Sequence, residues 1–354
     1  MPMPKKNLKA LFISCCCLLI TACAPAPEKI WQRSADGNRS YVADIANDAS
    51  FSVTSSDGQE LIMWHRDEAR PRYRMQQEQS EINQLIAVDI SADGQVIAAA
   101  SKENFALWDT NTGELQGYWR IQQEPNNEPG QRTQITSIVV SKKGDVLAMG
   151  LNTGKVIIFN PRSGRRLEML AHTDYITSLA ISPNGKYLLS GSYDGTALLW
   201  NTDTAAFLQR VEEAQPIMQV ALDANGRWFF TADRSDEASI WSVMTGEQQA
   251  KLQFNDRKRI FSSARFSHDG NFLLTGTPSR MIEIWDTESG DRIRRIEVSV
   301  PPGQRPTSAT VLAVAIDPNQ QTLWSENSSG IAELWQLRDV MPNPANSQTT
   351  PETP

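Results

Sequence analysis

The sequence has few of the residues from which metal sites and disulfide frameworks are built. Only three histidines and four cysteines occur in 354 residues, and no cysteine follows Cys23. Because all four cysteines lie at the N-terminus, the rest of the chain can form neither a disulfide framework nor a cysteine–zinc site. We therefore expect no metal and no cofactor.

The sequence also lacks the basic excess that is typical of nucleic-acid-binding proteins. Lys and Arg number 34 against 41 Asp and Glu, which gives a net charge of −7. Domains that bind nucleic acid normally carry a basic patch or stripe. Nucleic acid is therefore not an expected partner, and the 40% apolar content is that of an ordinary globular protein.

Motifs that carry enzyme chemistry are missing as well. No G-x-S-x-G segment is present, and Gly150–Lys155 is one residue too short for a phosphate-binding loop and is followed by Val156. Carboxylates are plentiful, but the sequence places no pair of them at catalytic distance. We interpret the protein as non-enzymatic.

The longest apolar run near the N-terminus is too short to span a membrane. Ala10–Ile20 has eleven residues, follows three lysines and ends at Ile20-Thr21-Ala22-Cys23, whereas a spanning helix needs about 20. Residues 1–22 are therefore predicted to be a signal peptide that the mature protein lacks.

The tetrapeptide that ends at Cys23 resembles the lipobox of bacterial lipoproteins. This resemblance implies cleavage before Cys23 and acylation of that residue, and Ala24 after it implies sorting to the outer membrane. The expected product is attached to that membrane by its lipids alone, through a tether of residues 23–27, and faces the periplasm. The leaflet stays open, and an ordinary secretory signal that happens to contain cysteine is the alternative.

The remaining chain is a repeat of about 41 to 50 residues that occurs seven times. Each unit has a four-residue turn rich in Ser, Asp, Asn and Gly, followed about fifteen to eighteen residues later by an aromatic that closes an apolar run. Repeats of this period are typical of solenoids and propellers. The seven closing aromatics are Trp64, Trp108, Phe159, Trp200, Trp241, Trp285 and Trp335.

Each unit divides into four short strands, with Gly, Asn, Asp and Pro at the breaks. In the fourth unit we expect strands at 176–181, 186–190, 196–200 and 205–211. Radial repetition of such units predicts an all-β, seven-bladed β-propeller of four-stranded antiparallel blades over residues 28–338, with a disordered tail at 339–354. The seventh unit lacks a fourth strand, and pairing residues 28–33 with its last strand would close the ring; a loose linker is the alternative.

The repeats resemble the WD-repeat family of propellers, and the fourth unit matches best, from Ala171-His172 to Trp200-Asn201. The resemblance implies a buried tetrad of His172, Ser190, Asp194 and Trp200 that locks this blade. The other six units depart from the pattern: the sixth, for example, keeps Thr275 but has Ser279 in place of the aspartate.

The two ends of such blades form two faces of a disc. The turns between strands one and two, and between three and four, share one face, and the other turns and the inter-blade links share the opposite one. His65 and His268 fall on the first face and His172 on the second, so the three histidines cannot converge on a metal.

Basic residues of the last three units gather on the link-bearing face, and the two long links share a Pro-Gly-Gln-Arg segment. Loops on a rigid scaffold commonly carry function, and arginine is favoured at interfaces. Ordinary hydrophilic loops are the competing interpretation. The candidate partner-binding residues are Arg132, Arg234, Arg257, Lys258, Arg259, Arg280 and Arg305.

These features predict a lipid-anchored periplasmic scaffold that binds partner proteins through its face loops. One alternative is an outer-membrane assembly factor of the barrel-assembly propeller type, which has eight blades. Another is a hydrolase that uses the central channel, which requires clustered acids or a metal at the channel mouth. Partner identity, oligomeric state and any small ligand in the channel stay open.

Overall fold

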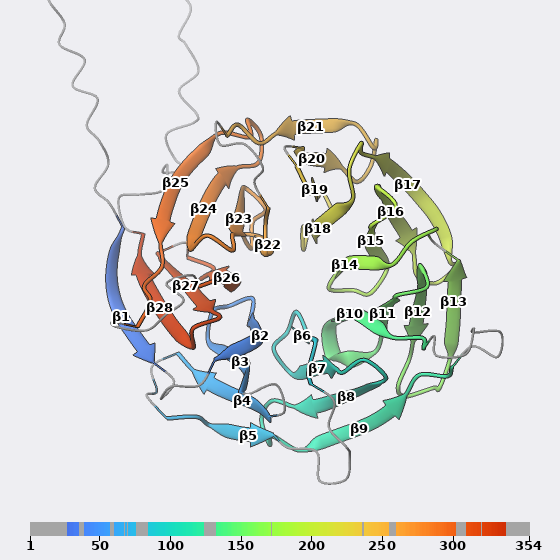
Figure 1. The fold of residues 1–354 in the computed structure, drawn as a ribbon, viewed down its shortest axis with the longest axis horizontal. Coiled ribbons are helices and arrows are strands. Elements are labelled where there is room, and N and C mark those ends of the chain that lie inside the picture. The colour runs from blue at the N-terminus through green and yellow to red at the C-terminus, as the bar shows by residue number, and fades with distance from the viewer. Residues whose placement is uncertain are drawn as a thin grey trace, which may run out of the picture.

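The computed structural model describes residues 27–337 apart from 35–38, 57–59, 67, 69, 76–83, 124–131, 171, 236, 255–259, 302–308 and 320. Seven four-stranded antiparallel sheets stand around a central axis, as Figure 1 shows. The predicted fold class, an all-β propeller of seven blades, is confirmed. Seven blades also count against the eight-bladed assembly factor.

The first four blades are continuous in sequence, and each runs from its inner to its outer strand. Their strands are, in blade one, β2 (Ser40–Ile45), β3 (Phe51–Ser56), β4 (Glu60–His65) and β5 (Tyr73–Met75); in blade two, β6 (Ala87–Ile90), β7 (Val96–Ala100), β8 (Asn104–Asp109) and β9 (Leu115–Arg120); in blade three, β10 (Ile135–Val140), β11 (Leu147–Leu151), β12 (Lys155–Phe159) and β13 (Arg166–Leu170); and in blade four, β14 (Ile176–Ile181), β15 (Tyr187–Ser192), β16 (Thr196–Asn201) and β17 (Ala206–Glu212).

Blades five and six follow the same order, whereas blade seven takes its outer strand from the N-terminus. A short 3-10 helix, η1 (Lys142–Gly144), lies in blade three. The remaining strands are, in blade five, β18 (Ile217–Leu222), β19 (Trp228–Asp233), β20 (Ala238–Ser242) and β21 (Gln248–Lys251); in blade six, β22 (Ser263–Phe266), β23 (Phe272–Gly276), β24 (Met281–Asp286) and β25 (Arg292–Glu297); and in blade seven, β26 (Val311–Ile316), β27 (Thr322–Asn327), β28 (Ile331–Gln336) and β1 (Glu28–Ser34).

The N-terminal strand closes the ring, as the sequence predicted. β1 pairs antiparallel with β28, from Glu28 opposite Gln336 to Ser34 opposite Ile331. Trp31 is not a loose linker residue: its ring lies edge-on to Trp324 at a centroid distance of 6.4 Å. The pairing covers the edge that β28 would otherwise leave exposed.

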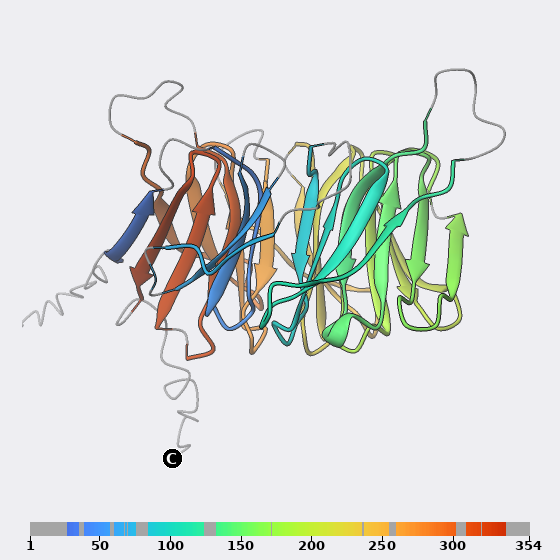
Figure 2. The ribbon, with the colours of Figure 1, turned by 90° about the horizontal axis from the view of Figure 1, so that it is seen from below.

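The disc has two faces, which Figure 2 shows from the side. We call the face with the inter-blade links and the turns between second and third strands the link face, and the opposite one the hairpin face. The link face is at the top of Figure 2. The described residues contain no helix long and apolar enough to cross a bilayer.

The core consists of apolar layers between neighbouring blades, because the middle strands of the blades are largely buried on both sides. Val96–Ala100 and Leu147–Leu151, for example, are buried at every position. Strands buried on both faces become continuous apolar runs rather than alternating ones. The closing aromatics lie in these layers, and Trp285 is fully buried. The ring is therefore a rigid frame for the loops on its two faces.

Candidate functional site

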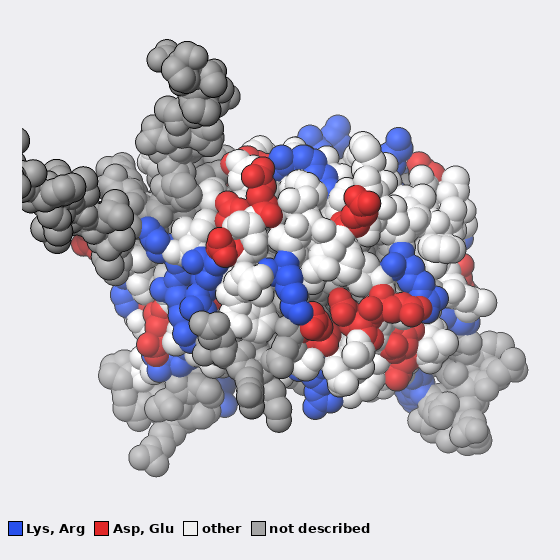
Figure 3. Space-filling view, turned by 90° about the horizontal axis from the view of Figure 1, so that it is seen from above, with Lys and Arg blue, Asp and Glu red and all other residues white. Residues whose placement is uncertain are grey.

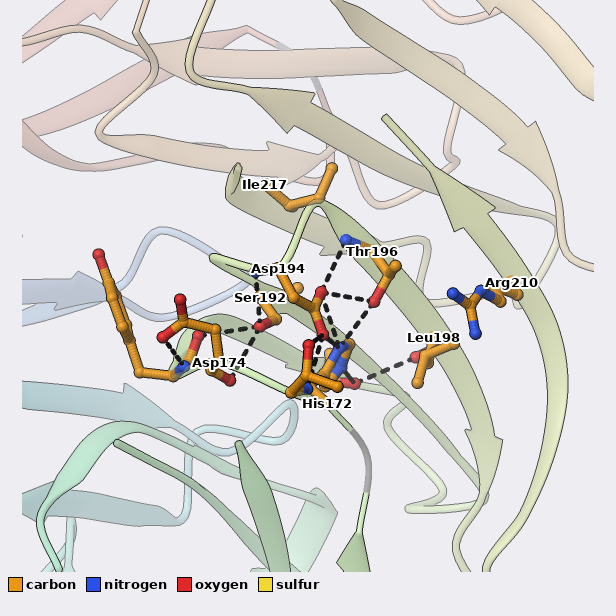
Figure 4. A network of polar contacts seen from close by, with 12 residues as sticks. His172, Asp174, Ser192, Asp194, Thr196, Leu198, Arg210 and Ile217 are labelled. Carbon is orange, nitrogen blue, oxygen red and sulfur yellow. Dashed lines mark hydrogen bonds and ion pairs between the residues drawn. The ribbon is translucent and has the colours of Figure 1, made fainter. Parts of the chain in front are cut away.

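The structure brings the four predicted tetrad residues of blade four together. Figure 4 shows His172 and Asp194 of this network, with Thr196 beside them. His172 Nε2 lies 2.8 Å from Ser190 Oγ, and Trp200 Nε1 donates to the same oxygen at 3.0 Å. His172 Nδ1 lies 3.2 Å from Asp194 Oδ2. The chain of contacts therefore runs from the link before β14 through β15 to the indole of β16.

Thr196 completes this network, although the family pattern did not indicate it. Its Oγ1 lies 2.8 Å from His172 Nδ1 and donates to Asp194 Oδ1 at 2.7 Å. The sequence did contain a signal for this contact, a threonine two residues after Asp194 at the start of the next strand. Side chains at turns commonly bond to near neighbours. The side chains of His172, Asp194, Thr196 and Ser190 thus contact one another in one connected network, which together with Trp200 we call the lock.

Burial and hydrogen bonding set the charge states in this lock. Burial of the imidazole lowers the pKa of His172, against the attraction of Asp194. Burial raises the pKa of Asp194, but hydrogen bonds from Thr196 and from the Thr173 N–H outweigh it, so that this pKa lies below its ordinary value. The His172 side chain is 0% exposed, and both of its ring nitrogens are bound within the blade, which fits a hydrogen-bonded connector.

The other blades keep only part of the lock. In blades one, five and six the closing indole donates to a threonine hydroxyl at 2.8–2.9 Å. Blades two and three have the buried apolar residues Ala98 and Met149 at that position. In blade seven, Trp335 Nε1 and Ser325 Oγ are buried without a hydrogen-bond partner in the described part of the chain. Within that part, the complete network occurs in blade four alone.

Of the seven predicted basic residues, the structure describes Arg132, Arg234 and Arg280. Arg257, Lys258, Arg259 and Arg305 lie outside the described residues, so their grouping stays a prediction. Arg132 forms an ion pair with Glu103 at 2.8 Å, and Glu103 also binds Arg120.

Arg280, in the turn between β23 and β24, is likewise bound within the molecule. Its φ of 72° turns the side chain back onto the carbonyl of Val298 at 3.0–3.1 Å, with Glu297 at 3.1 Å. Arg132, whose side chain is 65% exposed, and Arg280 thus each have partners within the molecule.

On the side of the rim that Figure 3 shows, the largest groups of basic and of acidic side chains lie in different places. Basic side chains gather over the outer strand of blade six, where β25 carries Arg292, Arg294 and Arg295. Acidic side chains gather towards the link face of blades four and five. Glu213 belongs to this acidic region, and burial together with Glu237 and Asp233 raises its pKa to about 7.

Arg234, a predicted partner-binding residue, lies beside a stacked pair of tyrosines. Its Nη1 donates to the Tyr193 hydroxyl at 2.9 Å, and Tyr193 stacks on Tyr175 at a centroid distance of 4.7 Å and 20°. Tyr175 precedes β14, Tyr193 follows β15 and Arg234 follows β19, so all three lie on the link face. Burial, Tyr193 and Asp174 raise the pKa of Tyr175, which keeps its hydroxyl neutral. We call these three residues the aromatic–arginine cluster.

The central channel, of about 430 Å³, is lined by the inner strands and contains two carboxylates. Asp44 forms an ion pair with Arg265 and accepts the Ile90 N–H at 2.8 Å. Asp89 accepts the Val140 N–H at 2.7 Å. Burial of Asp89 and the nearby charge of Asp44 raise the pKa of Asp89 well above its ordinary value.

These channel carboxylates meet one requirement of the hydrolase alternative. Each of them, however, accepts a backbone N–H of the next blade, and Asp44 also pairs with Arg265 of blade six, so they tie inner strands together. The described residues contain no group of metal-ligating side chains.

Comparisons with known proteins agree with this geometry. The family described as "WD domain, G-beta repeat" (WD40) matches residues 164–201, which hold the tetrad, and 246–286. Human WD repeat-containing protein 19 is 34% identical over 106 residues, which is 28% of this chain and 7% of that protein. The chain thus covers only a small part of that relative. The ring and these matches define a seven-bladed β-propeller with WD repeats, and they support the WD-repeat propeller family.

Proposed function

We propose that the protein is a non-enzymatic scaffold, anchored by lipids on Cys23 in the outer membrane, that binds partner proteins in the periplasm through its link face. The observation that carries this proposal is the aromatic–arginine cluster. Tyr and Arg are enriched at the energetic centres of protein interfaces. Here they are held by stacking and a hydrogen bond, which lowers the entropy lost on binding.

The surroundings of the cluster add specificity. Glu213 and Glu237 lie on the same face of the disc. Rim charges mainly orient and accelerate association, whereas buried aromatic anchors supply affinity. A partner that covers the cluster would therefore also meet the charges around it.

Substitution of the cluster tests the link face. We expect Tyr193→Ala with Arg234→Glu to remove a partner protein that is recovered by crosslinking from membranes, because both the aromatic anchor and the cation are lost. The thermal unfolding temperature should change by only a few degrees, since both side chains lie at the surface. Lys186→Glu, on the hairpin face, is the matched charge control and should retain the partner. Recovery of the same proteins from both variants would place the binding site elsewhere.

The anchor has a separate test. Cys23→Ser should abolish metabolic labelling with palmitate and release the protein from membranes, because several acyl chains on one residue provide the stable attachment. Labelling that persists in this variant would rule out Cys23 as the lipidated residue.

A further inference from the structure

A groove of about 480 Å³ lies between blades two and three at their hairpin-face ends. Its floor is formed by the apolar side chains of Val96, Leu107 and Trp119. In Figure 2 these two blades lie side by side, with the hairpin face at the bottom. Because the groove is on the face opposite the aromatic–arginine cluster, it is independent of the proposed scaffold function.

The aromatic floor of the groove is fixed in place. Trp119 of β9 stacks on Phe105 at a centroid distance of 5.4 Å and meets the edge of Phe159 at 5.3 Å. Gly117, two residues earlier on the same strand face, leaves the room that the indole occupies, since a Cβ there would collide with it. The indole is half-buried and still borders the groove.

The blade-two wall of the groove presents amide and carboxylate groups. Asp109 Oδ1 accepts the Asn111 N–H at 2.8 Å, and Gln116 Nε2 donates to Asp109 Oδ2 at 3.2 Å. Gln95 stands beside them. These groups are held by the strand end and its turn, and they offer both donors and acceptors to a ligand.

The blade-three wall is cationic. Arg162 is braced by Asp145 at 3.0 Å and by the Lys143 carbonyl at 3.4 Å. Lys143 is exposed, and no ion pair of its ammonium occurs among the residues that the structure describes. Because Arg162 is paired with Asp145, the ammonium of Lys143 is the cation of this wall that is left to meet an anionic ligand.

The backbone of Lys143 is strained. It has φ 62°, a conformation that is unfavourable for a residue with a side chain. The matching turns of blades two, four and six have Asp93, Asn184 and Asp269 there, whose side chains accept a backbone N–H within the turn. Blade three has Lys143 at this position, in a left-handed conformation, and its side chain makes no such bond within the turn as the structure describes it. Strain of this kind concentrates at binding sites.

We propose that this groove binds a short saccharide that carries a carboxylate. The C–H face of a sugar ring would lie against the Trp119 indole, and its hydroxyls, which both donate and accept, would bond to Asp109 and Gln116. The carboxylate of the ligand would form charge-assisted hydrogen bonds with the ammonium of Lys143 and the guanidinium of Arg162. A volume of about 480 Å³ lies within the range of small-ligand sites.

Calorimetric titration of the purified full-length protein, in a detergent without a sugar headgroup, tests this assignment. The probes are the glucuronic acid–N-acetylglucosamine disaccharide, neutral N,N′-diacetylchitobiose and a triglutamate peptide. We expect the acidic disaccharide to bind about tenfold more tightly than the neutral one, the effect of one charge-assisted bond. The peptide, which has no sugar ring for Trp119, should bind more weakly than the acidic disaccharide.

Variants then locate the binding. Trp119→Ala and Lys143→Gln should each weaken binding of the acidic disaccharide about tenfold, whereas Lys142→Gln, beside the groove, should leave it unchanged. Lys143→Gly should weaken binding and also raise the unfolding temperature, because glycine adopts this φ without strain, which separates lost affinity from lost folding. Absence of binding to either saccharide, equal effects of Lys142→Gln and Lys143→Gln, or peptide binding as tight as that of the disaccharide would overturn the proposal.

Discussion

Arg33→Ala is expected to lower the free energy of unfolding by about 3–5 kcal/mol, the cost of leaving a buried charge without its partner. Arg33 Nη2 donates to both carboxylate oxygens of Glu326 at 2.9 Å, and the two side chains are only 4% and 0% exposed. Ser52 of blade one also donates to Glu326, at 2.5 Å. The guanidinium covers the Trp64 ring at 3.9 Å. One arginine thus joins β1 to blades seven and one, and urea unfolding measures its effect.

A double variant separates the effect of the buried charge on stability from the effect of ring closure by β1. Arg33→Met with Glu326→Leu should regain most of the stability lost by Arg33→Ala, since well-packed apolar residues often replace a buried ion pair without loss. Arg74→Ala, which breaks an exposed pair with Glu60, is the surface control and should cost less than about 1 kcal/mol. A loss for Arg33→Ala as small as that of the surface control would show that β1 does not hold the ring closed.

Asp194→Ala and Trp200→Phe are each expected to destabilise the protein by about 1–3 kcal/mol, because each leaves buried partners without a hydrogen bond. Asp194 accepts bonds from the Thr173 and Thr196 backbones and contacts His172. Trp200 Nε1 donates to the buried Ser190 hydroxyl, which His172 also contacts. Removal of either end therefore interrupts the whole chain of contacts.

The matching position in blade six provides the control for the tetrad. Ser279 stands where the aspartate would be, is exposed, and contacts only the Thr277 hydroxyl at 3.1 Å among the bonds of its side chain that the structure describes. Ser279→Ala should consequently cost much less than Asp194→Ala in the same unfolding experiment. Equal shifts in unfolding temperature at the two positions would contradict the role given to the blade-four network.

The sequence predicted the blades well because their determinants are local. A turn and a closing aromatic recur in each unit, and the strands of blade four begin and end within two residues of the expected positions. The closing strand could also be predicted, because the seventh unit lacks a partner and residues 28–33 have strand character. The tetrad could be predicted because the fourth unit matches the WD-repeat pattern closely.

Contacts between distant segments could not be predicted from sequence. Arg265 of blade six reaches past blade seven to Asp44 of blade one, across 221 residues. Arg280 was predicted as a partner-binding residue, and nothing in the sequence indicated its left-handed φ or its hydrogen bond to the Val298 carbonyl. The groove at Trp119 likewise depends on how blades two and three approach each other. Each of these depends on geometry that only the closed ring defines.

Site-specific photocrosslinking in intact cells tests the central claim, binding through the link face, most directly. A photoreactive amino acid would replace Tyr193 in the aromatic–arginine cluster or Met244, which is 89% exposed in the hairpin-face turn between β20 and β21. We predict a discrete protein adduct from position 193 and none from position 244. An adduct from position 244 with none from position 193 would contradict the account.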